Sequence, residues 1–114
     1  MSRRRSTASA ALADAAPVFA ALGDPTRLRL VASLCSEGPQ SIARLSDGVP
    51  VTRQAVTKHL RALESAGLVR DRRNAGQRVW ELEPRGLRVA RGYLDRISEE
   101  WDGAIERLRA MVEE

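Results

Sequence analysis

The sequence TRQAVTKHLRALESAGLVR, residues 52–70, decides the fold of this chain. Thr52 is a suitable N-cap for a helix that reaches Ala66, and Gly67 is a suitable residue to end it. Successive side chains on a helix lie 100° apart, so the polar residues that begin with Arg53 fall within an arc of about 140°. Apolar residues occupy most of the remaining circumference. We therefore predict an amphipathic helix with one long cationic face and one face that packs inward.

A β-hairpin is predicted directly after this helix. Residues 68–73 and 77–82 have the pattern of two strands, and Asn74-Ala75-Gly76 joins them. Asn and Gly are suited to the positive φ angles of a tight turn. The turn is flanked by four cationic residues, Arg70, Arg72, Arg73 and Arg78. The base of the hairpin carries apolar residues that can anchor the sheet, namely Val79, Trp80 and Leu82.

Three further helices are predicted on the N-terminal side. Residues 8–22 are rich in Ala and Leu and end at Gly23, and Asp24-Pro25 is a strong start signal for a helix that runs to about Ser36. The inner face of this second helix is predicted to contain Leu28, Val31, Leu34 and Cys35. Ser41 can cap a short third helix, which Gly48 ends.

A final long helix begins at Pro84. Its apolar residues are spaced by three or four positions throughout: Leu87, Ala90, Leu94, Ile97, Trp101, Ile105, Leu108 and Val112. The predicted order is four helices, a hairpin and a long helix. This is a mainly α fold with a β-hairpin wing, the winged helix-turn-helix. The 114 residues suffice for one domain, which we place at residues 9–114 after a flexible basic arm at residues 1–8.

The distribution of charge indicates a polyanionic partner. The net charge is +4, but residues 51–80 alone carry seven basic side chains against Glu64 and Asp71. Arg and Lys pair with guanine O6 and N7, and Gln pairs with adenine N6 and N7. We predict contacts with double-stranded DNA from the cationic helix, the hairpin and one earlier cap: Thr52, Arg53, Gln54, Thr57, Lys58, Arg61, Arg70, Arg72, Arg73, Gln77, Arg78 and Ser41. Lys58 and Arg61 are expected to contact the phosphate backbone of the DNA more than the bases.

Other classes of function are weighed against this one. A winged-helix module that binds only protein would lack a cationic face, and this chain has one. An enzyme is not predicted, because the chain has one His, one Cys and no Gly-rich phosphate loop after a strand. The single Cys35 excludes an internal disulfide and suits a reducing compartment. Arg3-Arg4-Arg5 superficially resembles an export signal, but Asp14 interrupts the weakly apolar stretch that follows, so we expect a cytoplasmic protein without a membrane span.

Two stretches resemble the ArsR-type (ArsR/SmtB) family of repressors. Residues 19–30, FAALGDPTRLRL, are similar to the entry to the second helix of that family, and residues 52–70 are similar to its recognition helix and the start of its wing. The resemblance implies a homodimer that binds an inverted-repeat operator and represses transcription. It also implies an interface made by the first and last helices, to which we assign Leu12, Phe19, Leu87, Ala90, Leu94, Ile97, Trp101, Ile105 and Leu108.

The resemblance also raises the question of metal sensing, for which the residues are poorly suited. Thiolate sites in this family need two or more cysteines, and the chain has Cys35 alone. The other common site uses Asp, Glu and His on the last helix, which here has no His. The region from Phe19 through the last helix is similar to a metal-independent branch of the family. We predict no metal site and no cofactor, while a metal- or redox-responsive repressor remains the alternative and any small-molecule inducer is unknown.

Overall fold

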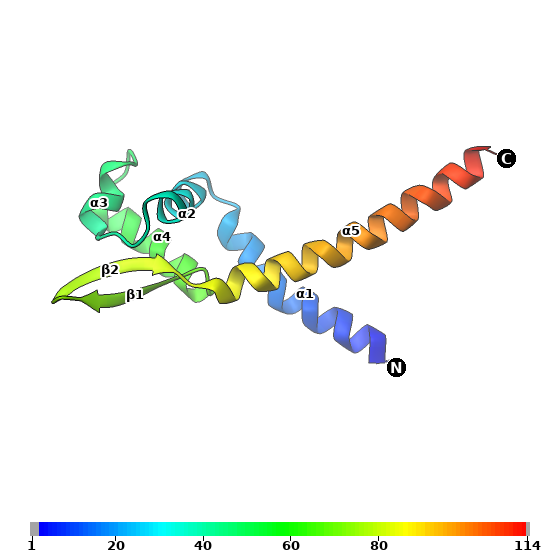
Figure 1. The fold of residues 1–114 in the computed structure, drawn as a ribbon, viewed down its shortest axis with the longest axis horizontal. Helices are drawn as coiled ribbons and strands as arrows, with labels where there is room; N and C mark the ends of the chain where they lie inside the picture. Colours follow the sequence, from blue (N-terminus) through cyan, green and yellow to red (C-terminus); the bar gives the residue numbers. More distant parts are fainter. Residues whose placement is uncertain (1–2, 114) are drawn as a thin grey trace.

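The computed structural model describes residues 3–113 and confirms the predicted order of elements (Figure 1). Helices α1 (Arg3–Leu22), α2 (Pro25–Glu37), α3 (Ile42–Asp47) and α4 (Arg53–Ser65) come first. Strands β1 (Val69–Asn74) and β2 (Gln77–Leu82) form an antiparallel hairpin, and α5 (Pro84–Glu113) follows. None of the described helices combines the length and the apolar character that a membrane span requires.

Three helices begin at the predicted caps. The side-chain oxygens of Asp24, Ser41 and Thr52 accept hydrogen bonds from backbone N–H groups three residues later, at distances of 3.0, 3.3 and 3.1 Å. Each cap satisfies one of the N–H groups that a helix leaves without an intrahelical partner. Helix α1 ends at Leu22 as predicted, but it begins at Arg3 rather than near residue 8. Residues 1–2 of the predicted arm lie outside the described residues.

The core lies where α1, α2, α3 and α4 meet the base of the hairpin. Its largest fully buried side chains are Trp80, Leu30, Leu60, Leu63, Val56 and Val69. The predicted inner face of α2 was partly wrong, since Leu28 is 50% exposed and Cys35 is exposed. Leu30 and Leu34 are the buried residues of this helix. The core-facing arc is centred on these two leucines, and at 100° per residue Leu28 and Cys35 lie more than about 100° from that centre, on the side that faces solvent.

The hairpin turn has two residues, so its geometry differs from the predicted three-residue loop. Asn74 pairs with Gln77 at the end of the ladder, and β1 therefore runs one residue further than expected. The positive φ angles belong to Ala75 (52°) and Gly76 (83°) rather than to Asn74. Two successive positive φ values are typical of a type I′ turn, which matches the twist of the flanking strands.

An isolated β-bridge between Gln40 and Trp80 joins the base of the hairpin to the helical body. Trp80 donates its backbone N–H to the carbonyl of Gln40 at 2.8 Å, and Gln40 donates to the carbonyl of Trp80 at 3.0 Å. The Gln40 side chain is buried and satisfied, because its amide donates to Ser33 and to the carbonyl of Gly38. These bonds fix the wing relative to α2 and α3.

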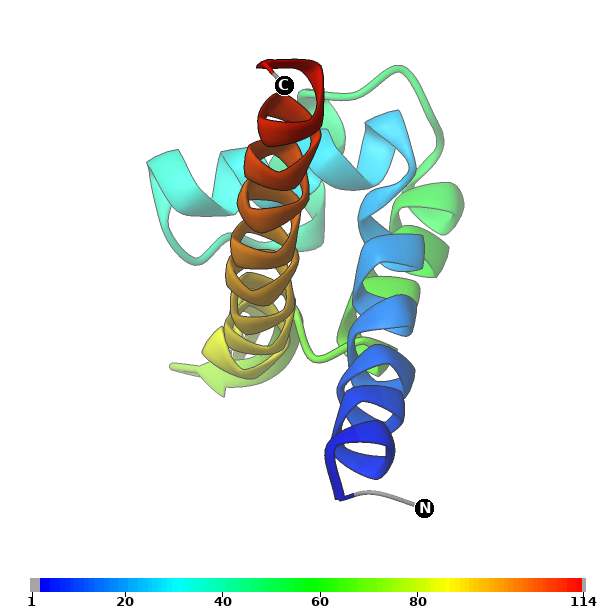
Figure 2. The ribbon, with the colours of Figure 1, turned by 90° about the vertical axis from the view of Figure 1, so that its right-hand side faces the viewer.

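Helix α5 leaves the wing beside α1 and then extends away from the body. Figure 1 shows the two helices crossing, Figures 1 and 2 show their free ends diverging, and the Phe19 and Tyr93 rings meet with centroids 6.1 Å apart. The C-terminal half of α5 projects past α1 into solvent, which gives the molecule a longest extent of 65 Å. The far end of α5 therefore has no core of its own within the chain.

Candidate nucleic-acid interface

The exposed face of α4 has the character that the sequence predicts. Arg53, Gln54 and Lys58 are exposed, as is the cap residue Thr52. The opposite face packs inward, with Val56, Leu60 and Leu63 at 0% exposure. The apolar residues thus hold the helix rigidly while its cationic N-terminal half faces solvent. A helix N-terminus that presents Arg, Gln and Lys side chains is suited to base edges and phosphates in a major groove.

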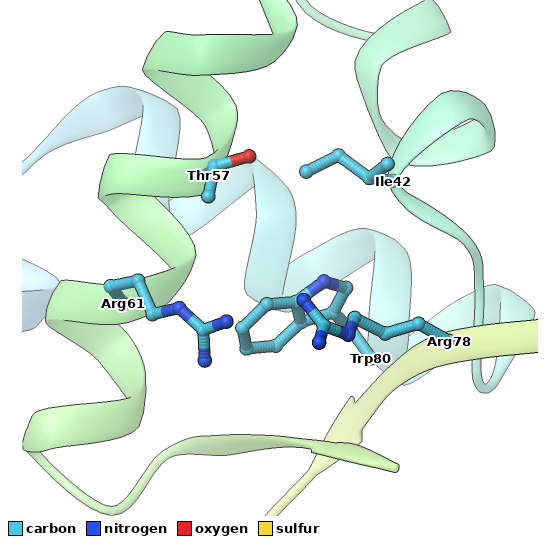
Figure 3. A pocket seen from close by; sticks show the side chains of 5 residues that line it. All are labelled: Ile42, Thr57, Arg61, Arg78 and Trp80. Carbon is cyan, nitrogen blue, oxygen red and sulfur yellow. The ribbon is translucent and has the colours of Figure 1, made fainter. Parts of the chain in front are cut away.

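A pocket of about 140 Å³ lies between this helix, α3 and the wing (Figure 3). Trp80 forms its floor, and Ile42, Thr57, Arg61 and Arg78 surround it. The hydroxyl of Thr57 donates to the carbonyl of Arg53 at 2.9 Å, so that proton is used within the helix. Thr57 is only partly exposed. Its place at the pocket mouth leaves its methyl group available to a ligand that approaches this seam.

Arg61 is held by three neighbours. Its Nη1 donates to Glu64 at 2.9 Å and lies 3.5 Å from Asp71, while its guanidinium carbon lies 4.9 Å from the centroid of Trp80. The hydrogen bond with Glu64 is the main cause that raises the pKa of Arg61 above its ordinary value. If Arg61 contacts the DNA phosphate backbone as predicted, its N–H donors are shared between the phosphate and the carboxylates of Glu64 and Asp71.

The wing arginines are also paired, with one exception. Arg70 lies 3.1 Å from Glu83 and 3.7 Å from Glu81, Arg72 pairs with Glu81, and the Nε of Arg78 lies 3.4 Å from Asp71. Within residues 3–113, no carboxylate lies within ion-pair distance of Arg73. The same holds for Arg53 and Lys58 on α4. These three side chains carry the positive charge of this surface that is not already offset.

Glu64 and Asp71 were noted in the sequence, but their pairing with arginines and the contribution of Glu81 and Glu83 were not predicted, although a signal for part of this pairing was present. In the hairpin register Arg70 lies opposite Glu81, and Asp71 lies opposite Trp80. A register derived from the two-residue turn would have placed these residues together, because cross-strand neighbours on one face interact. Gln77 and Arg73 remain exposed beside the turn, and Ser41 is partly buried where it caps α3.

Comparison with known proteins identifies the fold and its family. Residues 22–72 match the helix-turn-helix domain family. The HTH-type transcriptional regulator Rv2034 of Mycobacterium tuberculosis is 38% identical over 93 residues, which cover 82% of this chain and 83% of that protein. A solved ArsR-like transcriptional regulator from Rhodococcus sp. RHA1 is 34% identical with a TM-score of 0.75, and the match covers 87% of this chain and 92% of that one.

A second similar solved structure is the homodimeric winged helix-turn-helix DNA-binding domain of a possible ArsR-family regulator from Mycobacterium bovis. It is 25% identical with a TM-score of 0.63, and the match covers 94% of this chain and 93% of that one. This chain belongs to the ArsR family of winged helix-turn-helix transcriptional regulators. The predicted family is therefore confirmed. The relatives of this ArsR-family chain are DNA-binding regulators rather than enzymes, as the sequence analysis expected.

In this ArsR-family chain the one His, His59, connects α4 to α2. The Nδ1 of His59 accepts a hydrogen bond from the Nε of Arg27 at 3.2 Å and lies 3.9 Å from the Asp24 carboxylate. Arg27 also donates to the carbonyl of Ala21 at the end of α1. The backbone N–H of Arg27 is the main cause that lowers the pKa of Asp24. His59 thus has a structural partner, and among residues 3–113 no three His, Cys, Asp or Glu side chains gather as a metal site.

The predicted dimer residues of this ArsR-family chain divide into three groups. Six of them are exposed: Leu12, Leu87, Leu94, Trp101, Ile105 and Leu108. Phe19 and Ile97 are partly buried, and Phe19 packs against the core of its own chain. Ala90 is only 2% exposed because it packs into that core, so it has little surface to offer a partner. The five exposed residues of α5 share one face of that helix and form an apolar stripe along it, while Leu12 is exposed on α1.

Proposed function

We propose that this ArsR-family chain is a sequence-specific repressor that binds an inverted-repeat operator as a homodimer. The observation that carries the proposal is the exposed cationic face of α4, whose Arg53 and Lys58 are not paired with any acid of the described chain. These side chains can bind DNA phosphates or bases without first breaking an ion pair within the protein. Repression would follow from occlusion of the promoter by the bound dimer.

Direct readout is assigned to the first turn of α4. Arg53 and Gln54 are exposed at the helix N-terminus, where helix-turn-helix proteins contact base edges. Lys58 lies one turn further along and is assigned to the phosphate backbone, as is Arg73 beside the wing turn. A cationic side chain at the tip of a wing can reach the phosphates or the adjacent minor groove.

The homodimer is proposed to form through α1 and α5. The apolar stripe on α5 includes Trp101 at 67% exposure and Leu108 at 57%. Contiguous apolar patches of this kind mark protein interaction sites in soluble proteins. A two-fold axis through this interface would present two reading helices roughly 34 Å apart, which is one turn of DNA.

We further propose that the repressor belongs to the metal-independent branch of the family. Cys35 is the only Cys, and the one His is engaged with Arg27 on the far side of α4 from the reading face. Carboxylates without His or Cys bind transition metals weakly. A protein that binds promoters works where the chromosome is, so we propose a cytoplasmic location.

The first experiment recovers genomic fragments bound by the purified protein at near-physiological salt and sequences them. A short inverted repeat that overlaps a promoter is the expected result. Random fragments released by a modest rise in salt would contradict sequence-specific binding.

Two arginine variants then separate base readout from phosphate contact. Arg53→Ala is expected to weaken binding to the recovered operator by about 1–3 kcal/mol and to relax the preference at particular bases. Arg73→Ala is expected to weaken binding to all sequences alike and to reduce the log–log salt slope by about 0.9 per protomer. Both are measured by titration of labelled DNA over a salt series.

The matched control is Arg107→Ala, which removes an exposed arginine from the distant end of α5. It should leave both affinity and salt slope unchanged. An unchanged base preference in Arg53→Ala would show that this side chain does not read the sequence.

A further inference from the structure

One carboxylate occupies the centre of the cationic surface. The Oδ2 atom of Asp71 lies 3.5 Å from the Nη1 of Arg61 and 3.4 Å from the Nε of Arg78. Arg61 belongs to the reading helix α4, and Arg78 belongs to strand β2 of the wing. A single oxygen atom thus joins two elements that the proposed function assigns to DNA contact.

The two arginines converge over the same aromatic ring. Figure 3 shows the Arg61 guanidinium reaching from α4 to the Trp80 ring, and the Arg78 guanidinium overlapping that ring in the view. Trp80 is 2% exposed, and its backbone is held by the pairing with Gln40. The ring is therefore a fixed platform. Asp71 lies opposite Trp80 in the hairpin register, so its position is fixed by the same sheet.

The arrangement has an electrostatic consequence. Asp71 and Glu64 offset the charges of Arg61 and Arg78, so this seam attracts phosphate less than two arginines alone would. A carboxylate that faces DNA also repels it. Affinity for DNA of any sequence is therefore lower than the arginine count suggests, while the position of the wing relative to α4 is fixed.

We propose that Asp71 is a positioning residue for DNA recognition, which clamps Arg61 of the reading helix to Arg78 of the wing. The clamp holds the Arg61 and Arg78 side chains in one relative position and withholds both from non-specific phosphate contact. It thereby raises discrimination between operator and other DNA at the expense of total affinity. This inference rests on the proposed sequence-specific DNA binding.

The decisive variant is Asp71→Asn, which keeps the shape of the side chain and removes its charge. Binding to scrambled DNA is expected to become several-fold tighter at low salt. The log–log salt slope is expected to steepen by about 0.9 per protomer, since Arg78 becomes free to contact a phosphate. The ratio of operator affinity to scrambled-DNA affinity is expected to fall several-fold, because the Arg61 and Arg78 side chains are no longer held in one relative position.

Three further variants isolate the clamp from other effects of the substitution. Asp71→Glu retains a carboxylate and should retain the original salt slope. The double variant Asp71→Asn/Arg78→Gln should lose the added slope, because the released arginine is absent. Glu99→Gln removes an exposed acid on α5 and should change neither slope nor ratio.

The outcomes separate this inference from the proposed function. If the original protein discriminates operator from scrambled DNA and Asp71→Asn has the same slope and ratio, the clamp is wrong and the proposed function stands. If Asp71→Asn loses affinity for both DNAs with no change in slope, Asp71 supports only the fold and the clamp is again wrong. If the original protein does not discriminate, the proposed function itself fails.

Discussion

At the scale of single residues, the wing turn contains a local conflict between sequence and conformation. Ala75 has φ of 52°, and it is the only residue other than glycine with a positive φ among the described residues. The left-handed region places the Cβ of an L-residue close to the following carbonyl, which costs about 1–2 kcal/mol. Type I′ turns therefore favour Asn followed by Gly, and here the Asn lies one position too early.

Ala75→Asn is expected to raise the free energy of unfolding by about 0.5–1 kcal/mol, because Asn tolerates the left-handed conformation better than Ala. Denaturant titration followed by circular dichroism measures the change. Ala75→Val is the matched control and should lower stability, since a β-branched residue is strained at positive φ. Equal stability of the two variants would show that the turn relaxes to another conformation.

At the scale of elements, the junction of α4, the wing and α5 depends on two glycines. Gly67 ends α4 with φ of 74°, and Leu68 then donates its N–H to the carbonyl of Leu63 at 3.0 Å, as in a Schellman motif. Gly86 in the first turn of α5 donates to the carbonyl of Gly67 at 2.8 Å. A Cβ at Gly86 would lie 2.6 Å from the carbonyl oxygen of Ala66. The start of α5 can approach the end of α4 this closely only without a side chain.

Gly86→Ala is expected to lower the free energy of unfolding by about 1–3 kcal/mol, because backbone rather than a flexible side chain would have to move. Gly103→Ala makes the same change later in α5, where the nearest atom lies 3.5 Å away on the flexible side chain of Arg107. This control should raise stability by about 0.5–1 kcal/mol through helix propensity. Thermal unfolding of both variants measures the difference, and a loss of stability in both would refute the steric explanation.

At the scale of the whole molecule, the chain exposes more apolar surface on α5 than its own core can cover. The helix has 30 residues, which corresponds to about 45 Å, and only Gly86 and Ala90 near its start are buried. Leu94, Trp101, Ile105 and Leu108 are exposed on the part that leads away from the body. A second copy of the chain is the partner that the proposed function requires at this surface.

Leu94→Glu is expected to raise the dissociation constant of the dimer roughly tenfold or more, because a charge would be buried in the interface without a partner. Sedimentation equilibrium over a concentration series measures it. Arg107→Glu changes an exposed residue on the opposite side of α5 and should leave the dimer intact. An unchanged mass for Leu94→Glu would place the interface elsewhere.

The order of the elements and the starts of α2, α3 and α4 could be derived from the sequence because the forces that set them act within a few residues, whereas the start of α1 and the bounds of β1 were displaced. The caps at Asp24, Ser41 and Thr52 lie three residues from the N–H groups they satisfy, and the periodicity of α4 sets its buried face without reference to any other element. The turn at Ala75-Gly76 was predicted as a turn for the same reason. The register of the hairpin was not predicted correctly, because it depends on whether the loop has two or three residues.

The availability of the predicted DNA-contacting residues depends on the tertiary structure. The sequence shows seven basic side chains in residues 51–80. The packing of the wing against α4 pairs Arg61 with Asp71, the hairpin pairs Arg78 with the same carboxylate, and Arg53, Lys58 and Arg73 are left without such pairs among the described residues. The burial of Ala90 and the exposure of Cys35 likewise depend on how helices pack. Composition and periodicity decide which groups are charged or apolar. Contacts between segments distant in the sequence decide which of those groups are already occupied, and therefore which remain for a partner.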